Sequence, residues 1–472
     1  MENIHKIFWS YKSHNGGYKL EIDTYRFIGF LEENGFGNFI LGRTRFFVRL
    51  EKKIMKQVES HQINLFAKEY LRALPNDIFE HGFTIENLID QFHIRLSSLV
   101  HREQLFTLKN IEPNFKKDTK GSSFKFFKNG YIEITNSEIK CFDYKDLDGV
   151  IWDYQIINRN FELLSIKEFS EQNHFYSFLW NCMGQNVERL NSLMSILGYL
   201  MHTYKDPTTA KLVVLCDERI SDEPNGGSGK SLTIKAVSIF VKTANEDGKT
   251  FNAKSSFAFQ QVDFDTKLVF IDDVLKNFNM EPLFSPITGG IVIERKYKNK
   301  LFVSGEDSPK FVITTNYMVQ GTGLSFERRK IEIEFSDYYN KARTPDLEFG
   351  HRFFDDWKEE QWLKFDNMML FFIQYYIANG LVKSAEININ KRKLIQETNS
   401  DFIEFVDTLP RNVELNKTSE FNRFISRYPE YQYTHQRVFT KWLQIYADLK
   451  EGIDKIDESH SDLHRYFRLV TK

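Results

Sequence analysis

Residues 224–231 read Pro-Asn-Gly-Gly-Ser-Gly-Lys-Ser, and they follow an apolar run, Lys-Leu-Val-Val-Leu-Cys, at 211–216. A buried strand, a glycine-rich turn and a helix that starts at the turn are the three parts of a phosphate-binding loop. They bind phosphate because successive backbone N–H groups then point at its oxygen atoms. We therefore predict that the chain binds a nucleoside triphosphate. A surface loop that matches by chance is the alternative.

The position of each residue in the loop predicts what its side chain does. The residues predicted to surround the phosphates are Pro224, Asn225, Gly226, Gly227, Ser228, Gly229, Lys230, Ser231 and Leu232. Lys230 is expected to reach the β- and γ-phosphates, and Ser231 is expected to coordinate Mg²⁺. The usual pattern begins with Gly, whereas this chain has Pro224, which restricts the backbone but still supplies a turn.

Two later apolar runs end in the polar residues that triphosphate hydrolysis requires. The run at 267–274 contains Asp272, predicted to hold the metal shell, and Asp273, predicted to act as base or to position water. The run at 310–316 ends in Asn316, which is placed to sense the γ-phosphate and the attacking water. Taken alone, such an acidic pair is equally typical of a helix cap or a turn.

Two arginines follow in Ser-Phe-Glu-Arg-Arg-Lys at 325–330. Arg328 or Arg329 could act as an arginine finger, which neutralises charge during phosphoryl transfer across a subunit boundary. We favour Arg328 of the two. A solvated basic turn is the alternative.

A hairpin is predicted between the acidic pair and the asparagine, at 289–303, because apolar residues alternate on both sides of a charged turn. The turn contributes the candidate DNA-binding residues Arg295, Lys296, Tyr297, Lys298 and Lys300. Clustered cations with a ring among them suit phosphate contact and stacking on bases or sugars. An ordinary charged hairpin tip is the alternative.

The order and spacing of these motifs resemble the superfamily 3 helicases of DNA viruses and plasmids, which carry an AAA+ fold. Lys230 and Asp272 lie 42 positions apart, and Asp272 and Asn316 lie 44 apart. The resemblance covers about 206–335, and in that family a lysine and a neighbouring ring occupy the hairpin tip, where Lys296 and Tyr297 stand here. The flanks at 140–160 and 198–207 resemble helicase proteins of phages and integrated elements from Bacteroidetes-type bacteria.

The resemblance implies an ATP-dependent DNA helicase or translocase that uses ATP and Mg²⁺. It implies a ring oligomer, taken as a hexamer, around a single DNA strand, in replication of a phage, plasmid or integrated element. Primase or other replication proteins are further implied partners, although residues 1–150 hold no primase metal pair or zinc cluster. The alternative function is an NTP-dependent switch or assembly ATPase, for instance in anti-phage defence. A third reading is an initiator that recognises an origin.

Composition leaves the partner open but indicates the compartment. The 472 residues carry a formal net charge of −2, so any basic surface must be local. Three cysteines are too few and too scattered for a disulfide framework or a four-ligand zinc site. No signal peptide and no apolar window of membrane length is found, so we expect a protein of the bacterial host cytoplasm with no membrane partner.

The expected fold class is α/β, in four parts. Residues 1–150 form a mixed α and β domain, 151–205 a helical connector, and 206–340 an AAA+ core with a parallel sheet. Residues 341–472 are expected to be mostly helical, with a winged helix as one interpretation. Its recognition helix would be 434–447, with Val438, Trp442, Ile445 and Leu449 on the apolar face and Arg437 and Lys441 on another. A helix that merely packs by its apolar face is the alternative.

Overall fold

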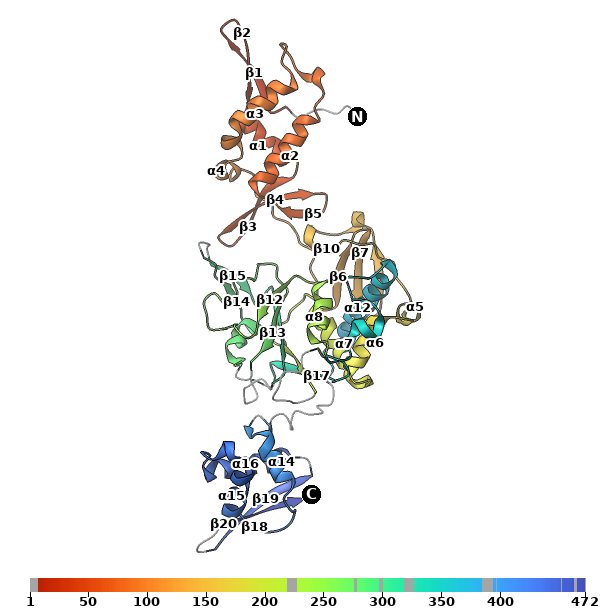
Figure 1. The fold of residues 1–472 in the computed structure, drawn as a ribbon. Helices are drawn as coiled ribbons and strands as arrows, with labels where there is room; N and C mark the ends of the chain where they lie inside the picture. Colours follow the sequence, from red (N-terminus) through yellow and green to blue (C-terminus); the bar gives the residue numbers. More distant parts are fainter. Residues whose placement is uncertain are drawn as a thin grey trace.

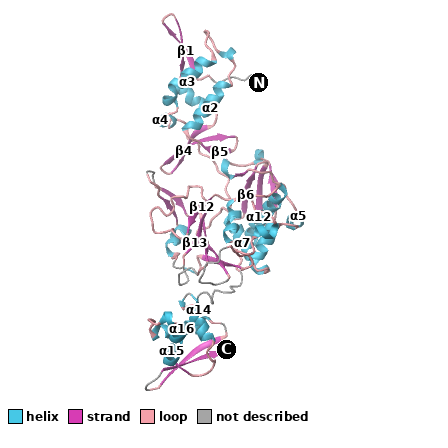
Figure 2. Cartoon of the chain, viewed as in Figure 1, coloured by secondary structure: helices cyan, strands magenta, loops and turns pink. Residues whose placement is uncertain are grey.

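The computed structural model describes residues 7–218, 227–275, 278–296, 300–317, 326, 328–383, 394–395, 397–450, 452–461 and 465–471. Figure 1 shows amino-terminal elements at one end, a central group around β11–β17, and carboxyl-terminal elements at the other end. Strands and helices are mixed in all three groups (Figure 2).

The amino-terminal group combines a hairpin, helices and a small sheet around an aromatic core. Its elements are β1 (Trp9–His14), β2 (Gly17–Ile22), α1 (Thr24–Glu33), β3 (Phe36–Leu41), β4 (Thr44–Glu51), β5 (Ile54–Gln57), α2 (Ser60–Arg72), α3 (Ile85–Leu99) and α4 (Arg102–Leu105). The hairpin of β1 and β2 turns at Asn15 and Gly16, which both have positive φ angles of 47° and 78°. That is the backbone form that two-residue hairpins prefer.

Two sheets are completed by strands that lie beyond residue 150. The other strands that precede residue 150 are β6 (Ser122–Phe127), β7 (Gly130–Thr135) and β8 (Ile139–Phe142), and the two that follow it are β9 (Ile151–Trp152) and β10 (Ile156–Ile157). β9 pairs in parallel with β5, and β10 pairs in parallel with β6. The segment expected to begin the helical connector therefore first closes the sheets of the part before it.

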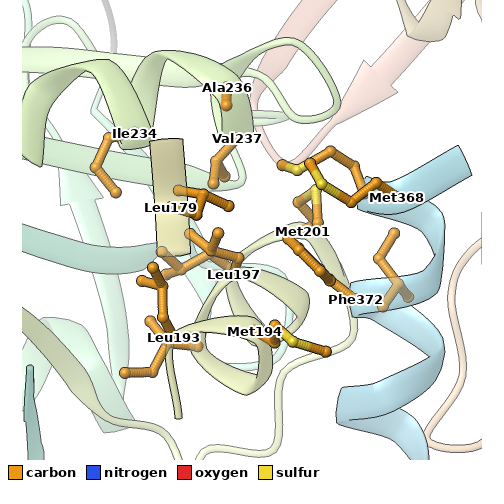
Figure 3. Close-up of a cluster of buried hydrophobic side chains, with 14 of the residues drawn as sticks. Leu179, Leu193, Met194, Leu197, Met201, Ile234, Ala236, Val237, Met368 and Phe372 are labelled. Atoms are coloured by element: carbon orange, nitrogen blue, oxygen red, sulfur yellow. The ribbon is translucent and has the colours of Figure 1, made fainter. Parts of the chain in front are cut away.

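Helices form the layer beside the central sheet. They are α5 (Ile166–Ser170), α6 (His174–Cys182), α7 (Val187–Met201), α11 (Pro345–Phe349) and α12 (Glu359–Asn379). Apolar residues on α7 recur three and four apart and are buried, including Leu193 and Leu197. Figure 3 shows them beside Val237 and Phe372, which come from α8 and α12. α12, counted with the carboxyl-terminal part from sequence, thus shares the core of the centre.

The central sheet contains five parallel strands in the order β12-β13-β16-β11-β17. The elements here are β11 (Leu212–Asp217), α8 (Lys230–Ser238), β12 (Thr243–Asp247), β13 (Leu268–Val274), α9 (Phe284–Thr288), β14 (Gly290–Ile293), β15 (Leu301–Ser304), β16 (Lys310–Thr315) and β17 (Lys330–Phe335). β11 is buried along its whole length, as near-continuous apolar runs in parallel sheets are. Parallel pairing brings the carboxyl ends of all five strands to one edge.

Buried lysines join the end of α7 to two sheets. Lys310, at the start of β16, donates to the carbonyl oxygens of Tyr199 at 2.6 Å and of His202 at 2.5 Å. Lys125, on β6, donates to the carbonyl oxygen of Met201 at 2.9 Å. Cations are favourable where a helix ends because its last carbonyl groups lack partners. Burial nevertheless holds the pKa of Lys310 well below its ordinary value.

The carboxyl-terminal group has more helix than strand, as expected from sequence, but it also contains a sheet. Its elements are α14 (Ser400–Asp407), β18 (Leu415–Asn416), α15 (Lys417–Arg427), α16 (Gln436–Leu449), β19 (Ile453–His460) and β20 (Arg465–Thr471). The three strands form one antiparallel sheet in the order β18-β20-β19. β18 is short and β19 is rich in charged residues, so neither shows clear apolar alternation. The helical periodicity of the other segments therefore determined the prediction.

Helices α7 and α12 approach each other closely at Gly198 of α7. A Cβ atom added there would overlap the backbone carbonyl of Phe372 and lie 2.6 Å from the Cβ of Tyr376, both on α12. We expect Gly198→Ala to lower the free energy of unfolding of the central group by about 1–3 kcal/mol through overpacking. Hydrogen exchange of α7 amides under mild denaturant measures the loss.

Gly29→Ala is the matched control, since Gly29 also lies in a helix but an added Cβ meets no atom within 4 Å. It should stabilise α1 by about 0.5–1 kcal/mol, because alanine loses less backbone entropy in a helix. Equal effects of the two substitutions on their own helices would contradict the packing argument.

Candidate functional site

The glycine-rich loop ends in a backbone that only glycine fits. Gly229 caps the amino end of α8 with φ at 98°, and Gly227 has φ at 109°. A Cβ atom on Gly229 would lie 2.7 Å from the ring of Phe178 and 2.9 Å from the sulfur of Cys182, both on α6. The helical layer therefore presses directly on the loop and fixes where α8 begins.

Lys230 is the centre of a polar cluster at the carboxyl edge of the sheet. Its ammonium group lies 2.5 Å from the carboxylate of Asp217, at the end of β11, and 3.2 Å from the side-chain oxygen of Asn316, just after β16. The hydroxyl of Ser228 donates to the same carboxylate oxygen at 2.5 Å. The structure therefore brings two predicted residues, Lys230 and Asn316, into direct contact and adds Asp217, which sequence reasoning missed.

Asp217 carries a signal that was available in the sequence, because an acid directly ends the buried strand before the loop. Its side chain and that of Lys230 are each 11% exposed, so this ion pair is largely shielded from solvent. Screening by salt is weak for such a pair. Asp217 can hold the lysine in place, and a phosphate would compete with it for the same ammonium group.

Ser231 and Asp272 form an oxygen-rich pair next to the lysine. The hydroxyl of Ser231 donates to both carboxylate oxygens of Asp272, at 3.0 and 3.1 Å. Thr314 of β16 also donates to this carboxylate. Mg²⁺ prefers oxygen ligands and takes only one or two from the protein when phosphates and water supply the rest. The two predicted metal residues fit such an ion, with Thr314 orienting the carboxylate.

A bulge turns Asp273 away from its neighbour. The register between β13 and β16 shifts between Ile271 and Val274, and Asp273 has a φ of 58°, a rare value for a residue with a side chain. Its carboxylate pairs with Lys249 at 2.9 Å, which raises the pKa of that lysine. The carboxylates of Asp272 and Asp273 therefore lie in different surroundings.

Arg328 and Arg329 lie at the opposite edge of the sheet. They precede β17, whose first residue pairs with Leu212 at the start of β11, and the Leu212 N–H donates to the Arg329 carbonyl at 2.8 Å. Six residues of β11 separate that edge from the loop, roughly 16 Å at strand spacing. Arg328 is exposed, whereas Arg329 is half-buried with its guanidinium 4.8 Å from the ring of Phe284.

The predicted hairpin is present as β14 and β15, paired from Gly290 with Ser304 to Ile293 with Leu301. Lys296 is exposed and has no ion pair among the residues that the structure describes. Lys300 is also exposed and pairs with Glu294 at 2.8 Å. Both ammonium groups remain accessible to a ligand from solvent.

Arg295 has a different environment from the two lysines. Its guanidinium donates to the carbonyl oxygens of Gln260 and Val262 at 2.8 and 2.6 Å and to the carboxylate of Asp263 at 2.5 Å. Despite burial, Arg295 and Lys242 keep the pKa of Asp263 below its ordinary value. This corrects the grouping from sequence, because Arg295 fastens the hairpin base to the loop at 260–266 instead of extending from the tip.

The same loop reaches the amino-terminal sheet through Phe264. Its ring centroid lies 5.1 Å from that of Phe46, 5.6 Å from that of Trp152 and 6.3 Å from that of Phe39. Lys242, before β12, pairs with Asp265 at 2.6 Å and holds the loop from the other side. One short loop thus contacts both the hairpin base and the amino-terminal sheet.

Several predicted residues cannot be placed. Pro224, Asn225, Gly226, Tyr297 and Lys298 lie outside the described residues. Leu232 lies in the first turn of α8 and is half-buried. Throughout the described part of the chain, the helices are too short or too polar to cross a membrane.

Comparisons with known proteins give distant structural similarity only. No protein-family model matches the sequence, and no curated protein does. The chain is similar to the apo structure of the NrS-1 C-terminal region, with 11% identity, a TM-score of 0.42, and coverage of 94% of this chain and 99% of that one. It is similar to SCCmec type IV Cch, described as an active helicase, with 10% identity, a TM-score of 0.32, and coverage of 98% and 97%.

A third similar structure is JCV helicase, with 13% identity, a TM-score of 0.28, and coverage of 52% of this chain and 61% of that chain. Two of these three neighbours are thus named as helicases. Similarity at this level is low, so the geometry of the chain itself must carry any functional conclusion.

The contacts of Arg295 predict how the hairpin is held. Arg295→Ala removes three hydrogen bonds from a charged donor, each of a kind that contributes about 1.5–3 kcal/mol in buried settings and less at this partly exposed site. We expect amide exchange in 290–293 and 260–266 to accelerate about tenfold. Lys300→Ala is the control from the same hairpin and should change the amide exchange rates of these segments little. Equal acceleration in both variants would show that Arg295 does not anchor the hairpin.

Proposed function

We propose that this protein is an ATP-dependent DNA helicase or translocase of superfamily 3, with an AAA+ core that works as a ring oligomer. The observation that carries the proposal is the meeting of Lys230, Asp217 and Asn316 at one edge of a parallel sheet, beside Ser231 and Asp272. A lysine and a hydroxyl at a helix start, with a carboxylate and an amide at the ends of neighbouring strands, are the groups that bind and hydrolyse a nucleoside triphosphate.

Each of these side chains has a task in the proposed reaction. Lys230 binds the β- and γ-phosphates and exchanges its ion pair with Asp217 for them. Ser231 and Asp272 would hold Mg²⁺, which would supply positive charge to stabilise the charge that develops during phosphoryl transfer. Asp273 orients or deprotonates the attacking water, and its pair with Lys249 must open for that task. Asn316 contacts the γ-phosphate and so reports whether hydrolysis has occurred.

We propose that Arg328 acts on the nucleotide of a neighbouring subunit. Its position at the amino edge supports this, because the loop of the same chain lies at the other end of β11. A head-to-tail ring joins two different surfaces of neighbouring subunits, and we propose that the amino edge of one subunit meets the carboxyl edge of the next. Arg329 suits this task less well because its guanidinium packs on Phe284.

We propose that the hairpin tips grip one DNA strand inside the ring. The accessible ammonium groups of Lys296 and Lys300 support phosphate contact, which needs no base sequence. The exposed cross-strand pair of Val292 and Phe302 adds an apolar surface next to them, 50% and 63% exposed. Aromatic side chains beside cations are typical of single-strand binding surfaces.

The carboxyl-terminal group supports a role at DNA as a winged helix. Its order, helix, strand, two helices and a two-stranded wing, is the one expected for that fold, with α16 as the recognition helix. Arg437 and Lys441 are exposed on α16, whereas Phe439 and Leu443 are buried. Replication of a phage, plasmid or integrated element, with primase or other replication proteins as partners, is the process we propose.

A forked-duplex unwinding assay with ATP, on tails of either polarity, tests the proposal. Lys230→Ala should abolish both ATP hydrolysis and unwinding because the phosphates lose their cation. Lys296→Ala should keep most basal hydrolysis but lose its stimulation by single-stranded DNA and at least about 90% of unwinding. Hydrolysis that ignores DNA in the unaltered protein, with no unwinding on either tail, would favour an NTP-dependent switch instead.

Mixed oligomers test the trans action of Arg328. Arg328→Ala and Lys230→Ala should each be inactive alone, yet a one-to-one mixture should recover about a quarter of the normal hydrolysis rate. That fraction follows because an intact Arg328 and an intact Lys230 then meet at one interface in four. A mixture that stays inactive, while the two variants still co-assemble, would show that the arginine does not act across subunits.

A further inference from the structure

One stretch of the amino-terminal group is strongly basic, although the chain as a whole is not. Residues 43–56 cover β4 and most of β5 and carry six cations and one carboxylate, whereas the formal net charge of the chain is −2. Arg49 donates to the carbonyl oxygen of Asn34 at 3.1 Å. Lys53 donates to the carbonyl oxygen of Lys145 at 2.8 Å. These two cations therefore hold the fold together, and the others need a different explanation.

Three exposed arginines gather at the end of the sheet where β3 turns into β4. Arg43 lies in that turn, Arg45 lies on β4, and Arg102 is the first residue of α4. We call these three residues the arginine patch. Among the residues that the structure describes, none of the three forms an ion pair. The patch therefore presents positive charge to solvent without a carboxylate to neutralise it.

Arg45 and Arg102 share one aromatic ring. Their guanidinium carbons lie 4.7 and 5.3 Å from the centroid of the Phe106 ring, so these like charges are at most about 10 Å apart, roughly one Debye length at 0.1 M salt. Arg45 also donates to the Phe106 carbonyl oxygen at 3.0 Å, which orients its guanidinium. The fold thus holds two cations close together, and an anion that contacts both relieves their repulsion.

The opposite face of β4 connects the patch to the hairpin of β14 and β15. Neighbouring residues of a strand point to opposite faces, so Phe46 lies on the other side of β4 from Arg45. The Phe46 ring packs on Phe264 with centroids 5.1 Å apart, and Arg295 of the hairpin base binds the same loop at 260–266. Figure 1 shows this end of the amino-terminal group next to the part of the centre that carries β14 and β15. The patch and the hairpin are therefore held near each other.

A nucleic-acid backbone fits these features better than an acidic protein surface does. Guanidinium groups bind phosphate oxygens through two parallel hydrogen bonds and can stack on a ring at the same time. The backbone is a continuous row of anions, so a strand that reaches the hairpin can extend to the patch. Ile40, which lies opposite Arg45 in the pairing of β3 with β4 and is 41% exposed, adds an apolar contact for a sugar or a base.

We propose that the arginine patch binds the phosphate backbone of nucleic acid as a second contact outside the hairpin. The inference rests on the proposed function for the presence of DNA at the hairpin, and it gives the amino-terminal group a part in holding that DNA. Contact with phosphates carries no sequence information, so the patch binds any sequence. DNA that leaves the hairpin is then still bound at the patch, and its return to the hairpin is an intramolecular step.

Salt titrations of DNA binding by the full chain, read by fluorescence anisotropy, test the patch. The probes are a thymidine single strand of about 30 nucleotides and a blunt duplex of about 30 base pairs, which exceed the size of one contact. Arg45→Ala with Arg102→Ala should weaken binding about tenfold. It should also reduce the slope of log K against log salt by about 1.4 for the single strand or about 1.8 for the duplex, because two phosphate contacts are lost. The probe that responds shows whether opened or unopened DNA lies at the patch.

Two further variants control for charge and for folding. Arg26→Ala with Arg72→Ala removes two exposed arginines from the same group, at the start of α1 and the end of α2, which are the helix ends away from the β3–β5 sheet. Affinity and slope should stay within about twofold of normal. Arg43→Glu covers the case in which loss of Arg45 loosens α4, because Arg43 lies in an exposed turn. It should weaken binding at least about fivefold by repelling phosphate. Hydrolysis of ATP without DNA should be unchanged in all of these variants.

The outcomes separate the patch from the helicase proposal. Unchanged affinity and slope in both sets of patch variants would overturn the patch, even if the protein unwinds DNA. Equal weakening in the control variant would also overturn it, because any exposed arginine would then contribute. Patch-dependent binding of polyglutamate, with DNA affinity unaffected, would assign the surface to an acidic protein instead. Selective loss of DNA affinity in a chain that fails to unwind would support the patch and contradict the helicase, whereas a chain that binds no DNA would overturn both.

Discussion

Hydrogen bonding between β11 and its two neighbours is the constraint on which the site depends. β11 pairs in parallel with β16 and with β17, so Cys216 lies opposite Thr315 and Asp217 opposite Phe335. This register sets Lys230, Asn316 and the candidate metal-binding pair at one edge and the candidate arginine finger at the other. β16 is buried along its whole length, as β11 is, so packing on both faces of the sheet supports these strands as well.

Much of the fold could be predicted because strong periodicity survives tertiary packing. The apolar run before the loop became β11, and the three- and four-residue spacing near Leu193 became α7. The expected apolar face of α16 was displaced by one position, because Phe439 and Leu443 are buried while Val438 is 38% exposed. Apolar residues are adjacent in that helix at 438–439, 442–443 and 445–447, so periodicity alone could not choose which of them is buried.

The candidate site was predictable where a motif carries it and not where a long-range contact does. Ser231 and Asp272 meet as the motifs imply. Asp217 was missed because an acid at a strand end is ordinary in sequence and acquires meaning only when Lys230 lies beside it. Arg295 looked equivalent to Lys296, yet a loop more than thirty positions earlier in the chain supplies its acceptors. No local pattern encodes such a partner.

The loop at 260–266 makes two remote parts of the protein mechanically dependent. Because Arg295 grips one side of the loop and the ring of Phe264 sits among Phe39, Phe46 and Trp152 on the other, the hairpin base has no independent freedom. Displacing it means either carrying the amino-terminal sheet along or withdrawing a phenylalanine from its neighbours, which costs on the order of 1.5–3 kcal/mol for full exposure. The aromatic cluster therefore resists small displacements of the hairpin base, and only a larger force would separate Phe264 from its neighbours.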